Sequence, residues 1–221
     1  AATRERDKFH IKKHLSKDIE LKDITDDLCV FGLFGPKSRD LIKTISKDNF
    51  ENDNFKFSSA KYISIKGIKV WAQRLSYVGE LGYELYVDLK DAKKIYELLI
   101  EKGKDFNLSN CGMHAMDIMR MESGFLHWGH DISPEENQYQ AGLAFTISKK
   151  KDVNFIGKQA IKKIKQEKIK TRFAVFIFKE SEPGKPLVLH DEPIYIEDKI
   201  IGRSTSGNYS FNFKKNLVFG Y

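Results

Sequence analysis

Three strand-like segments follow one another between residues 60 and 87, and only short turns join them. The segments AKYISI and IKVWAQRLSY are separated by Lys66–Gly67, and the glycine-bearing turn VGELG leads into YELYV. Such segments joined by tight turns are typical of antiparallel hairpins, whereas parallel strands need a long crossover between them. The stretch therefore predicts an antiparallel meander, which any fold of this chain has to contain.

Helical patterns flank the meander on both sides. The apolar segment DDLCVFGLF predicts a buried strand, after which Gly35–Pro36 starts a helix. Beyond the meander, residues 90–102 have helical spacing with Gly103 as a C-terminal cap, and a second helix runs over about 112–123. Because no βαβ crossover repeats, we predict an α+β fold with a mostly antiparallel sheet and flanking helices.

The character of the chain changes after about residue 170. Four of its five prolines lie at positions 134, 183, 186 and 193, and short apolar segments alternate there with turn residues. We expect five strands, in RFAVFIF, PLVLH, PIYIED, KIIGRSTSG and NLVFGY, and hence a small all-β, barrel-like C-terminal domain. The predicted organisation is a region over 1–147, a basic helical connector over 148–170, and the β domain over 171–221.

Composition narrows the class of protein. The chain has 221 residues, of which 41% are hydrophobic and 31% charged, as in folded globular proteins. No segment approaches the roughly 20 apolar residues of a membrane span, and the opening residues AATRERDKFH lack the apolar core of a signal peptide. Only two cysteines are present, which favours a reducing compartment. We expect a cytoplasmic protein without a membrane partner.

The formal net charge of +7 is concentrated in one segment. Residues 149–179 carry eleven basic residues against two acidic ones. Only seven of the 38 basic residues are arginines, although nucleic-acid recognition usually depends on the bidentate guanidinium group. We therefore expect no nucleic-acid partner, and interpret the lysine run either as a solvated helix face or as a surface for an acidic ligand tail.

Several apparent motifs do not support a site. The segment GLFGPKS resembles a phosphate-binding loop, but Pro36 has no backbone N–H and the spacing is too short. His127, His130 and Asp131 offer metal-ligand chemistry, but no further cluster completes a set, and we predict no metal. No nucleophile-and-base pattern is present, so the residues identify no catalytic group.

The segment RLSYVGELGYELYV carries the strongest candidate. Side chains alternate along a strand, so Glu84 and Tyr86 share one face while Tyr83 and Leu85 point to the other. If residues 78–82 reverse the chain, Tyr77 on the preceding strand comes close to Glu84. The alternative is an exposed glutamate on an edge strand with the aromatic rings packed in the core.

This segment resembles the signature of the glycine-cleavage T-protein superfamily, the tetrahydrofolate-dependent aminomethyltransferases. Further matches follow in order along nearly the entire chain: VFGLFGPKSRDLI, MRMESGFLHWGHDISPEENQYQAGLAFTI, NFIGKQAI and IIGRSTSGNYS. The HWGHD element is similar to the folate domain at the C-terminal end of dimethylglycine and sarcosine dehydrogenases.

The resemblance implies a binding site for tetrahydrofolate. Glu84 matches the glutamate that holds the pterin, whose ring N–H and amino group suit a carboxylate. Tyr77, Leu85 and Tyr86 match neighbouring folate contacts, and the contact of Leu85 would come through its backbone. Phe145 stands where relatives often carry a tyrosine, so stacking is kept there but the hydroxyl is lost.

Two departures from the family pattern matter. Met116 replaces the arginine of the free-standing T-proteins, as it does in the dehydrogenase-linked domains, and cannot hold an anion. The aspartate that relatives place near the reactive folate nitrogen would lie before Ala1, so the resemblance implies an N-terminally truncated chain that is inactive alone. Glu122, two positions from Arg120, lies on another helix face, which excludes a simple intrahelical pair between them. For Arg120 we prefer a buried ion pair with another element over a folate contact.

The function implied is the capture of a one-carbon unit from an oxidised methylamine or glycine derivative as 5,10-methylene-tetrahydrofolate. The expected partners are a small-molecule substrate and a missing N-terminal region, such as a flavin dehydrogenase. Two alternatives stay open: a non-catalytic folate-binding or regulatory relative, and a folate-dependent demethylase with another methyl donor.

Overall fold

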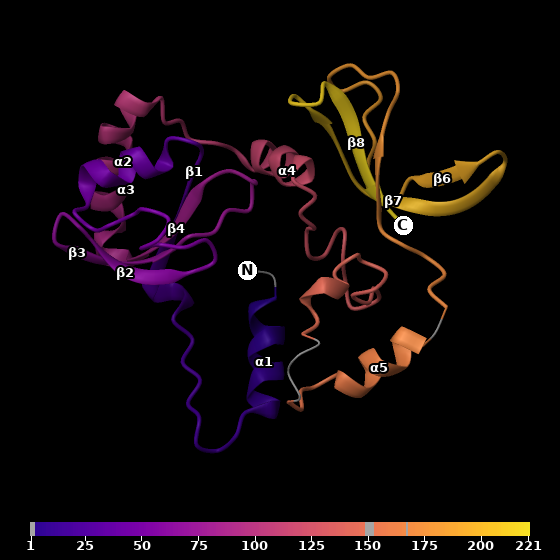
Figure 1. The fold of residues 1–221 in the computed structure, drawn as a ribbon, viewed down its shortest axis with the longest axis horizontal. Helices are drawn as coiled ribbons and strands as arrows, with labels where there is room; N and C mark the ends of the chain where they lie inside the picture. The colour runs from indigo at the N-terminus through magenta and orange to yellow at the C-terminus, as the bar shows by residue number, and fades with distance from the viewer. Residues whose placement is uncertain (1–2, 149–152, 167) are drawn as a thin grey trace. The chain divides into compact units, whose positions relative to one another are not determined.

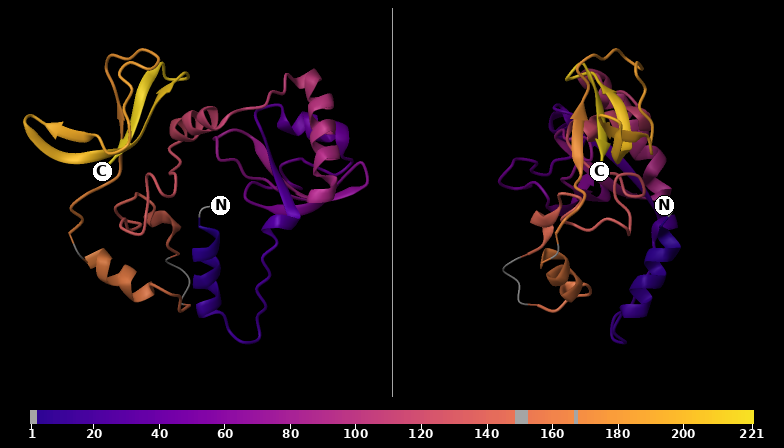
Figure 2. Two further views of the ribbon diagram at one scale, coloured as in Figure 1. Left: turned by 180° about the vertical axis from the view of Figure 1, so that it is seen from behind. Right: turned by 90° about the vertical axis from the view of Figure 1, so that its right-hand side faces the viewer.

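The computed structural model describes residues 3–148, 153–166 and 168–221, and they form two compact units. The first unit holds residues 1–75 and 81–108, and the second holds residues 76–80 and 109–221. Figure 1 follows the chain through both units, and Figure 2 gives two further views. Compactness therefore divides the chain after residues 75, 80 and 108, and the boundaries predicted at 147 and 170 stay predictions.

The first unit is built around a four-stranded antiparallel sheet. Its strands are β1 (Leu28–Phe34), β2 (Ala60–Ile65), β3 (Ile68–Gln73) and β4 (Gly82–Asp88), in the order β1-β4-β3-β2. The predicted meander is confirmed, and β4 is a central strand because both β1 and β3 pair with it.

Two helices cover one face of this sheet, α2 (Ser38–Ile45) and α3 (Leu89–Gly103) (Figure 1). Leu41, Ile42 and Ile45 of α2 are buried, as are Ile95 and Leu99 of α3. They pack with the buried side chains of the sheet into one core, which includes the aromatic cluster Phe50, Phe55 and Tyr83. The predicted strand, helix and α+β class are confirmed here.

The chain before β1 contributes little to the core. Helix α1 (Arg4–His14) buries none of its residues, and the short helix η1 (Thr25–Asp27) follows it. Arg4 forms ion pairs with Asp23 and Asp26 at 2.8 and 2.9 Å. The pair with the exposed Asp26 contributes little to stability, whereas the pair with Asp23 is partly buried.

The second unit combines helices with a second antiparallel sheet. Helix α4 (Met113–Glu122) confirms the second predicted helix, and α5 (Lys158–Gln166) lies within the predicted connector. The strands are β5 (Ala174–Ile177), β6 (Pro193–Ile196), β7 (Lys199–Ser210) and β8 (Lys215–Gly220), in the order β5-β8-β7-β6. A small core of Met121, Leu217 and Phe219 joins α4 to this sheet.

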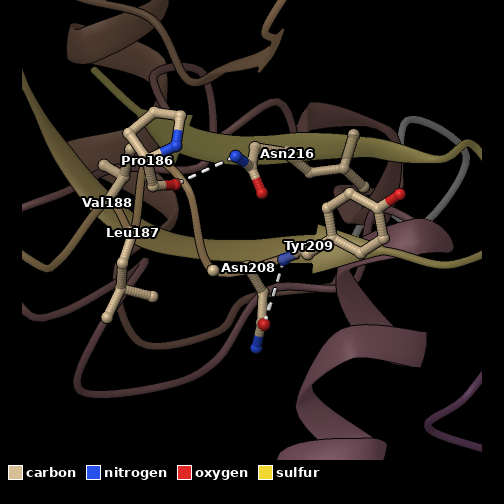
Figure 3. Close-up of a pocket in the computed structure, with 8 residues that line it drawn as sticks. Pro186, Leu187, Val188, Asn208, Tyr209 and Asn216 are labelled. Atoms are coloured by element: carbon tan, nitrogen blue, oxygen red, sulfur yellow. Dashed lines mark hydrogen bonds between the residues drawn. The ribbon is translucent and has the colours of Figure 1, made fainter. Parts of the chain in front are cut away.

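One predicted strand, PLVLH, is wrong. Residues 186–190 have no strand pairing. Side chains bond to the Leu189 backbone instead, since its N–H donates to Glu192 Oε1 at 2.5 Å and its carbonyl oxygen accepts from Ser204 Oγ at 2.6 Å. The Asn216 side-chain amide donates to the carbonyl oxygens of Lys185 and Pro186, at 3.1 and 2.9 Å. A small pocket lies against this segment, lined also by Asn208, Tyr209 and Leu217 (Figure 3).

The predicted cap at Gly103 is also wrong. Gly103 is the last residue of α3, and its own dihedral angles are helical. The chain continues into the short helix η2 (Lys104–Phe106), and only Asn107 takes the left-handed conformation. Glycine is needed at 103 for space, because a Cβ there would lie 2.4 Å from Leu108 Cδ2 and 2.5 Å from its Cβ.

Replacing Gly103 by alanine is therefore expected to destabilise the first unit. Overpacking of this kind costs about 1 to 3 kcal/mol, more than the helix propensity that alanine adds. Chemical denaturation measures the loss. On a Leu108→Gly background, which removes all three contacting carbons, the same change should cost much less, and an equal loss on both backgrounds would show that the close contact with Leu108 is not the cause.

Candidate functional site

Strand β4 presents a carboxylate and a phenol on the face of the sheet opposite α2 and α3. Tyr83, Leu85 and Val87 are fully buried in the core, so Glu84 and Tyr86 project from the other face. The Tyr86 hydroxyl donates a hydrogen bond of 3.0 Å to Glu84 Oε2. The predicted alternation along this strand is confirmed.

The second oxygen of Glu84 is available as an acceptor. Oε1 has no hydrogen-bond partner among the residues that the structure describes. Burial and the bond to Glu84 raise the pKa of the Tyr86 phenol, which keeps it protonated as a donor. The carboxylate is thus held at one oxygen and open at the other.

An aromatic ring that the sequence analysis missed lies on this same face. Glu84 stands opposite Gly32 on β1 and opposite Gln73 on β3. The Phe34 ring covers Gly32 and Gly82, since a Cβ at these glycines would lie 2.6 Å and 2.4 Å from its atoms. The sequence signal is the glycine–aromatic alternation in FGLFG, which allows a ring to lie flat over the strands.

Leu85 belongs to the core, as expected for its side chain. It stands between Phe31 of β1 and Ala72 of β3, and its exposed fraction is 0%. A folate contact through its backbone stays a prediction. Phe145 lies in the short helix η3 (Ala144–Thr146) of the second unit with 82% of its surface exposed, and its stacking role stays a prediction.

Tyr77 lies in the second unit, where its ring stacks on Phe125. The ring centroids are 6.1 Å apart and the planes differ by 17°, and the Tyr77 hydroxyl donates to the carbonyl oxygen of Leu126 at 2.9 Å. Burial raises the pKa of this phenol. Glu84 falls in the other unit, so the meeting of the two residues at one pocket wall stays a prediction.

The tight turn after Tyr77 is held against the end of α4. Gly79 has a φ of +75°, and a Cβ at this position would lie 1.9 Å from Ser123 Oγ. Ser123 Oγ also donates to the carbonyl oxygen of Val78. Only glycine satisfies both the left-handed conformation and the close approach.

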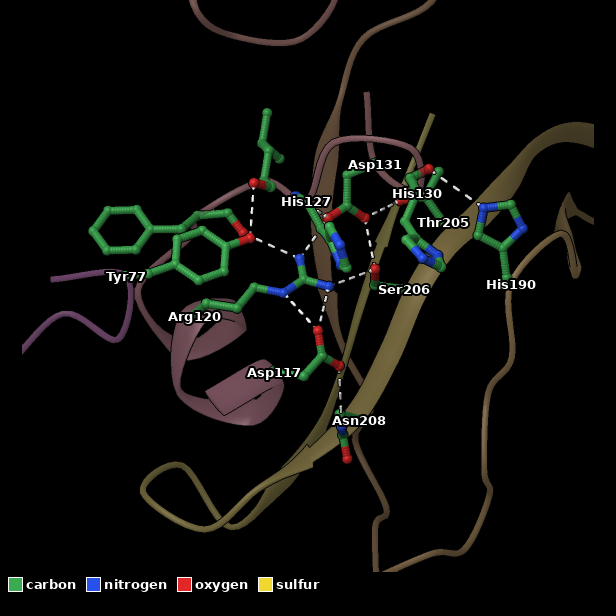
Figure 4. Close-up of polar contacts among 12 residues, drawn as sticks. Tyr77, Asp117, Arg120, His127, His130, Asp131, His190, Thr205, Ser206 and Asn208 are labelled. Atoms are coloured by element: carbon green, nitrogen blue, oxygen red, sulfur yellow. Dashed lines mark hydrogen bonds and ion pairs between the residues drawn. The ribbon is translucent and has the colours of Figure 1, made fainter. Parts of the chain in front are cut away.

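Arg120 forms the buried ion pair that we predicted. Its exposed fraction is 1%, and Nη1 contacts the equally buried carboxylate of Asp131, from the turn that follows α4 (Figure 4). Asp117, three positions earlier on α4, is a second partner at 2.8 Å that the sequence analysis missed. Glu122 is directed elsewhere and accepts from Ser210 Oγ at 2.6 Å.

The histidines of HWGHD contact one another. The His127 and His130 rings are 4.4 Å apart, and His190 from the β domain lies 5.7 Å from His130 (Figure 4). Asp131 faces Arg120, Thr205 and Ser206 instead of the imidazoles. Within the described ranges no group of three or more His, Cys, Asp or Glu residues has the arrangement of a metal site.

The pocket of Figure 3 lies in the second unit and shares Asn208 with the cluster of Figure 4, since Asn208 Nδ2 donates to Asp117 Oδ2 at 3.4 Å. Its cavity volume is only about 40 Å³. Ligand pockets usually enclose about 300 to 1,000 Å³. The candidate site of the first unit is the polar face of β4, and Tyr77 in the second unit is described by itself.

Comparison with known proteins decides the family. The model of the family described as "GCVT N-terminal domain" matches residues 1–151, more than half of the chain. The chain belongs to this family. The resemblance to the glycine-cleavage T-protein superfamily that the motifs indicated is thereby confirmed.

Two relatives of this chain are much longer than the chain itself. The chain is 35% identical to human mitochondrial dimethylglycine dehydrogenase over 204 residues, which cover 92% of the chain and 23% of that enzyme. It is 38% identical to 4-methylaminobutanoate oxidase (formaldehyde-forming) of Paenarthrobacter nicotinovorans over 187 residues, covering 85% of the chain and 22% of that protein. The chain thus spans less than a quarter of the length of either relative.

The fold has a counterpart of known structure. The crystal structure of the glycine cleavage system aminomethyltransferase T from Bartonella henselae superimposes with a TM-score of 0.79. It covers 99% of this chain and 58% of its own length at 20% sequence identity. At this identity the similarity shows the shared fold.

His127 predicts a pH dependence of stability. Burial is the main cause that lowers its pKa, His130 and Arg120 act in the same direction, and Asp117 and Asp131 oppose them. The unfolded chain therefore binds a proton at His127 more readily than the folded chain does. The free energy of unfolding should fall as the pH drops through about 6.5, the usual pKa of histidine.

Unfolding measured between pH 8 and pH 5 checks this dependence. The His127→Gln variant should lose part of the decline, while the matched variant His114→Gln removes an exposed imidazole from α4. Identical pH profiles for both variants would contradict the assignment to His127.

Proposed function

We propose that this domain binds tetrahydrofolate, and that the protein it belongs to captures a one-carbon unit from an oxidised methylamine or glycine derivative as 5,10-methylene-tetrahydrofolate. Membership of the family supports the proposal. So do the names of two relatives, since dimethylglycine and 4-methylaminobutanoate are both N-methylated amines. Both relatives are much longer than this chain, so we propose that further residues of the kind they carry complete the reaction.

The observation that carries the proposal is the half-occupied carboxylate of Glu84. A pterin presents a ring N–H beside an amino group, and a carboxylate accepts both in parallel, as it does from guanidinium. Tyr86 fixes one oxygen of Glu84 at 3.0 Å, and the Phe34 ring lies on the same face of the sheet. A planar heterocycle with adjacent donors suits this combination of an anchored acceptor and an aromatic ring.

The protein's share of the chemistry would be positioning. Tetrahydrofolate supplies the nucleophilic nitrogen, so the chain's residues have to hold the pterin and exclude water. Glu84 would orient the ring, and Tyr86 would keep Glu84 from turning. Tyr77, Leu85 and Phe145 are proposed as the further contacts, and Arg120 is committed to its buried ion pairs.

The name of the Paenarthrobacter relative favours a second candidate. That enzyme is named a formaldehyde-forming oxidase of 4-methylaminobutanoate. A protein that demethylates another amine, with folate as the acceptor, would use the same domain. Formation of methylene-tetrahydrofolate with a panel of N-methyl donors separates the two, and folate binding without turnover on any donor would indicate the non-catalytic alternative.

The cellular location is likewise a proposal. Among the described residues no helix has the length and apolar character needed to cross a bilayer. A cytoplasmic location stays a prediction, and the human relative is named as mitochondrial.

Replacing Glu84 by glutamine tests the pterin anchor. Glutamine keeps the shape but exchanges one acceptor oxygen for a donor, which would face a pterin N–H and cost about 1 to 3 kcal/mol of binding free energy. Isothermal titration with tetrahydrofolate measures the affinity. Asp88→Asn is the matched control, because it removes a carboxylate from the exposed end of the same strand. Equal affinities in the wild type and a folded Glu84→Gln variant would remove Glu84 from the site.

The lysine run is proposed to attract a polyglutamate tail of the folate. Lys149, Lys150 and Lys151 lie outside the described residues, whereas Lys162, Lys163 and Lys165 are exposed on α5. Attraction between exposed charges is screened over about 10 Å at 0.1 M salt. Pentaglutamyl folate should therefore bind more tightly than the monoglutamate at low salt, and the difference should shrink at high salt.

Two triple variants test whether the α5 lysines cause the preference for pentaglutamyl folate. Neutralising the three α5 lysines to glutamine should abolish the preference for the long tail, while the same change at Lys90, Lys93 and Lys94, which are also exposed, should not. Equal binding of both folates to the wild type at low salt would leave the run as a solvated surface.

A further inference from the structure

Three consecutive residues after α4 are fixed by hydrogen bonds. The carbonyl oxygen of Phe125 accepts from Arg120 Nη1 at 3.1 Å, and that of Leu126 accepts from the Tyr77 hydroxyl at 2.9 Å. The backbone N–H of His127 donates to Asp131 Oδ2 at 2.9 Å. The Leu126 carbonyl that orients Tyr77 belongs to the same peptide group as the His127 N–H, so Asp131 holds this group directly and Arg120 holds the carbonyl of the preceding one.

The pair itself is anchored in the β domain. Ser206 Oγ accepts from Arg120 Nη2 and donates to Asp131 Oδ1, both at 2.7 Å (Figure 4). Thr205 Oγ1 donates to the same carboxylate oxygen at 2.6 Å. Strand β7 thus supplies two hydroxyl groups that fix the charged pair, although it lies some 80 residues further along the chain.

The Arg120 guanidinium group can hold the Phe125 carbonyl, Asp131 and Ser206 together because each of its nitrogens has a hydrogen-bond partner. Nε contacts Asp117 Oδ1 at 2.8 Å, Nη1 contacts Phe125 and Asp131, and Nη2 contacts Ser206. A buried cation without partners would be strongly destabilising, whereas two carboxylates and a carbonyl satisfy this one. Its planar fork has no equivalent in lysine.

We propose that Arg120 is a positioning residue for the folate site. It fixes the Phe125 carbonyl and, through Asp131, the adjacent Leu126–His127 peptide, whose carbonyl oxygen orients the hydroxyl and hence the ring of Tyr77. This role rests on the proposed function, because Tyr77 is a folate contact only if the domain binds folate. Arg120 acts through Phe125 and Leu126 and does not itself contact the ligand.

Glu122 provides a control that separates the positioning of Tyr77 from the simple attachment of α4 to the C-terminal strands. Glu122 also joins α4 to the β domain, accepting from Ser210 Oγ at 2.6 Å and from Asn212 Nδ2 at 2.5 Å. No described hydrogen bond links Glu122 to residues 125–127. Glu122→Gln is therefore a matched control that weakens the same attachment and leaves the Tyr77 acceptor alone.

The experiment compares Arg120→Lys with Glu122→Gln in protein labelled with 3-fluorotyrosine, the Tyr77 resonance being assigned by Tyr77→Phe. We expect Arg120→Lys to shift or broaden the Tyr77 fluorine signal without ligand and to raise the Kd for tetrahydrofolate about tenfold, equivalent to about 1.4 kcal/mol. Glu122→Gln should leave the signal in place and change the Kd less than twofold. In a double-mutant cycle, Arg120→Lys should add little to the effect of Tyr77→Phe.

The outcomes separate this inference from the proposed function. An unchanged Tyr77 signal in Arg120→Lys, or equal Kd changes in the two variants, would overturn the positioning role. If the wild type binds no folate, the proposed function fails while the fluorine signal still reports whether Arg120 orients Tyr77. Should Arg120→Lys not fold, Ser206→Ala removes one bond each from Arg120 and Asp131 and should produce a smaller shift of the same signal.

Discussion

The buried pair of Arg120 and Asp131 is the interaction on which the second unit depends. Its members come from α4 and from the turn after it, and the hydroxyls of Thr205 and Ser206 on β7 complete the cluster. Burying two charges is unfavourable unless their geometry satisfies both, and here every charged atom has a partner. The cluster therefore permits few alternative packings of α4 against β7.

The first unit depends on the central place of β4. Neighbouring strands on both sides fix the backbone of this strand, so its side chains have well-defined directions. Leu85 and its buried neighbours hold the sheet to α2 and α3, while Glu84 and Tyr86 remain on the opposite face. One strand thus serves the core and the candidate site at once, and a one-residue register shift would exchange the two roles.

The sequence predicted whatever depends on local periodicity. The meander, the strand and helix before it and the helix over Met113–Glu122 all follow from spacing and turn residues. Contacts made at a distance were missed. The backbone of Pro186 and Leu189 is bonded by the side chains of Asn216, Glu192 and Ser204 in place of a neighbouring strand. Gly103 serves the approach of Leu108 and not a helix cap.

The same limit applies to the candidate site. Alternation placed Glu84 and Tyr86 on one face correctly, because strand geometry alone decides it. The ring of Phe34 beside them depends on the pairing of Gly32 with Glu84, which the sequence of β1 does not encode by itself. Arg120 was correctly placed in an ion pair, but its bond to Phe125 depends on the path of the chain after α4.

The five residues Ser76–Glu80 belong to the second unit although the chain on both sides of them belongs to the first. The polypeptide therefore passes between the units three times, after residues 75, 80 and 108. A cut at residue 108 does not release two independent halves, since the C-terminal piece would lose Tyr77 and with it the ring that stacks on Phe125. The two units are covalently interleaved, so neither can evolve by simple exchange with a homologous module unless this short segment is exchanged as well.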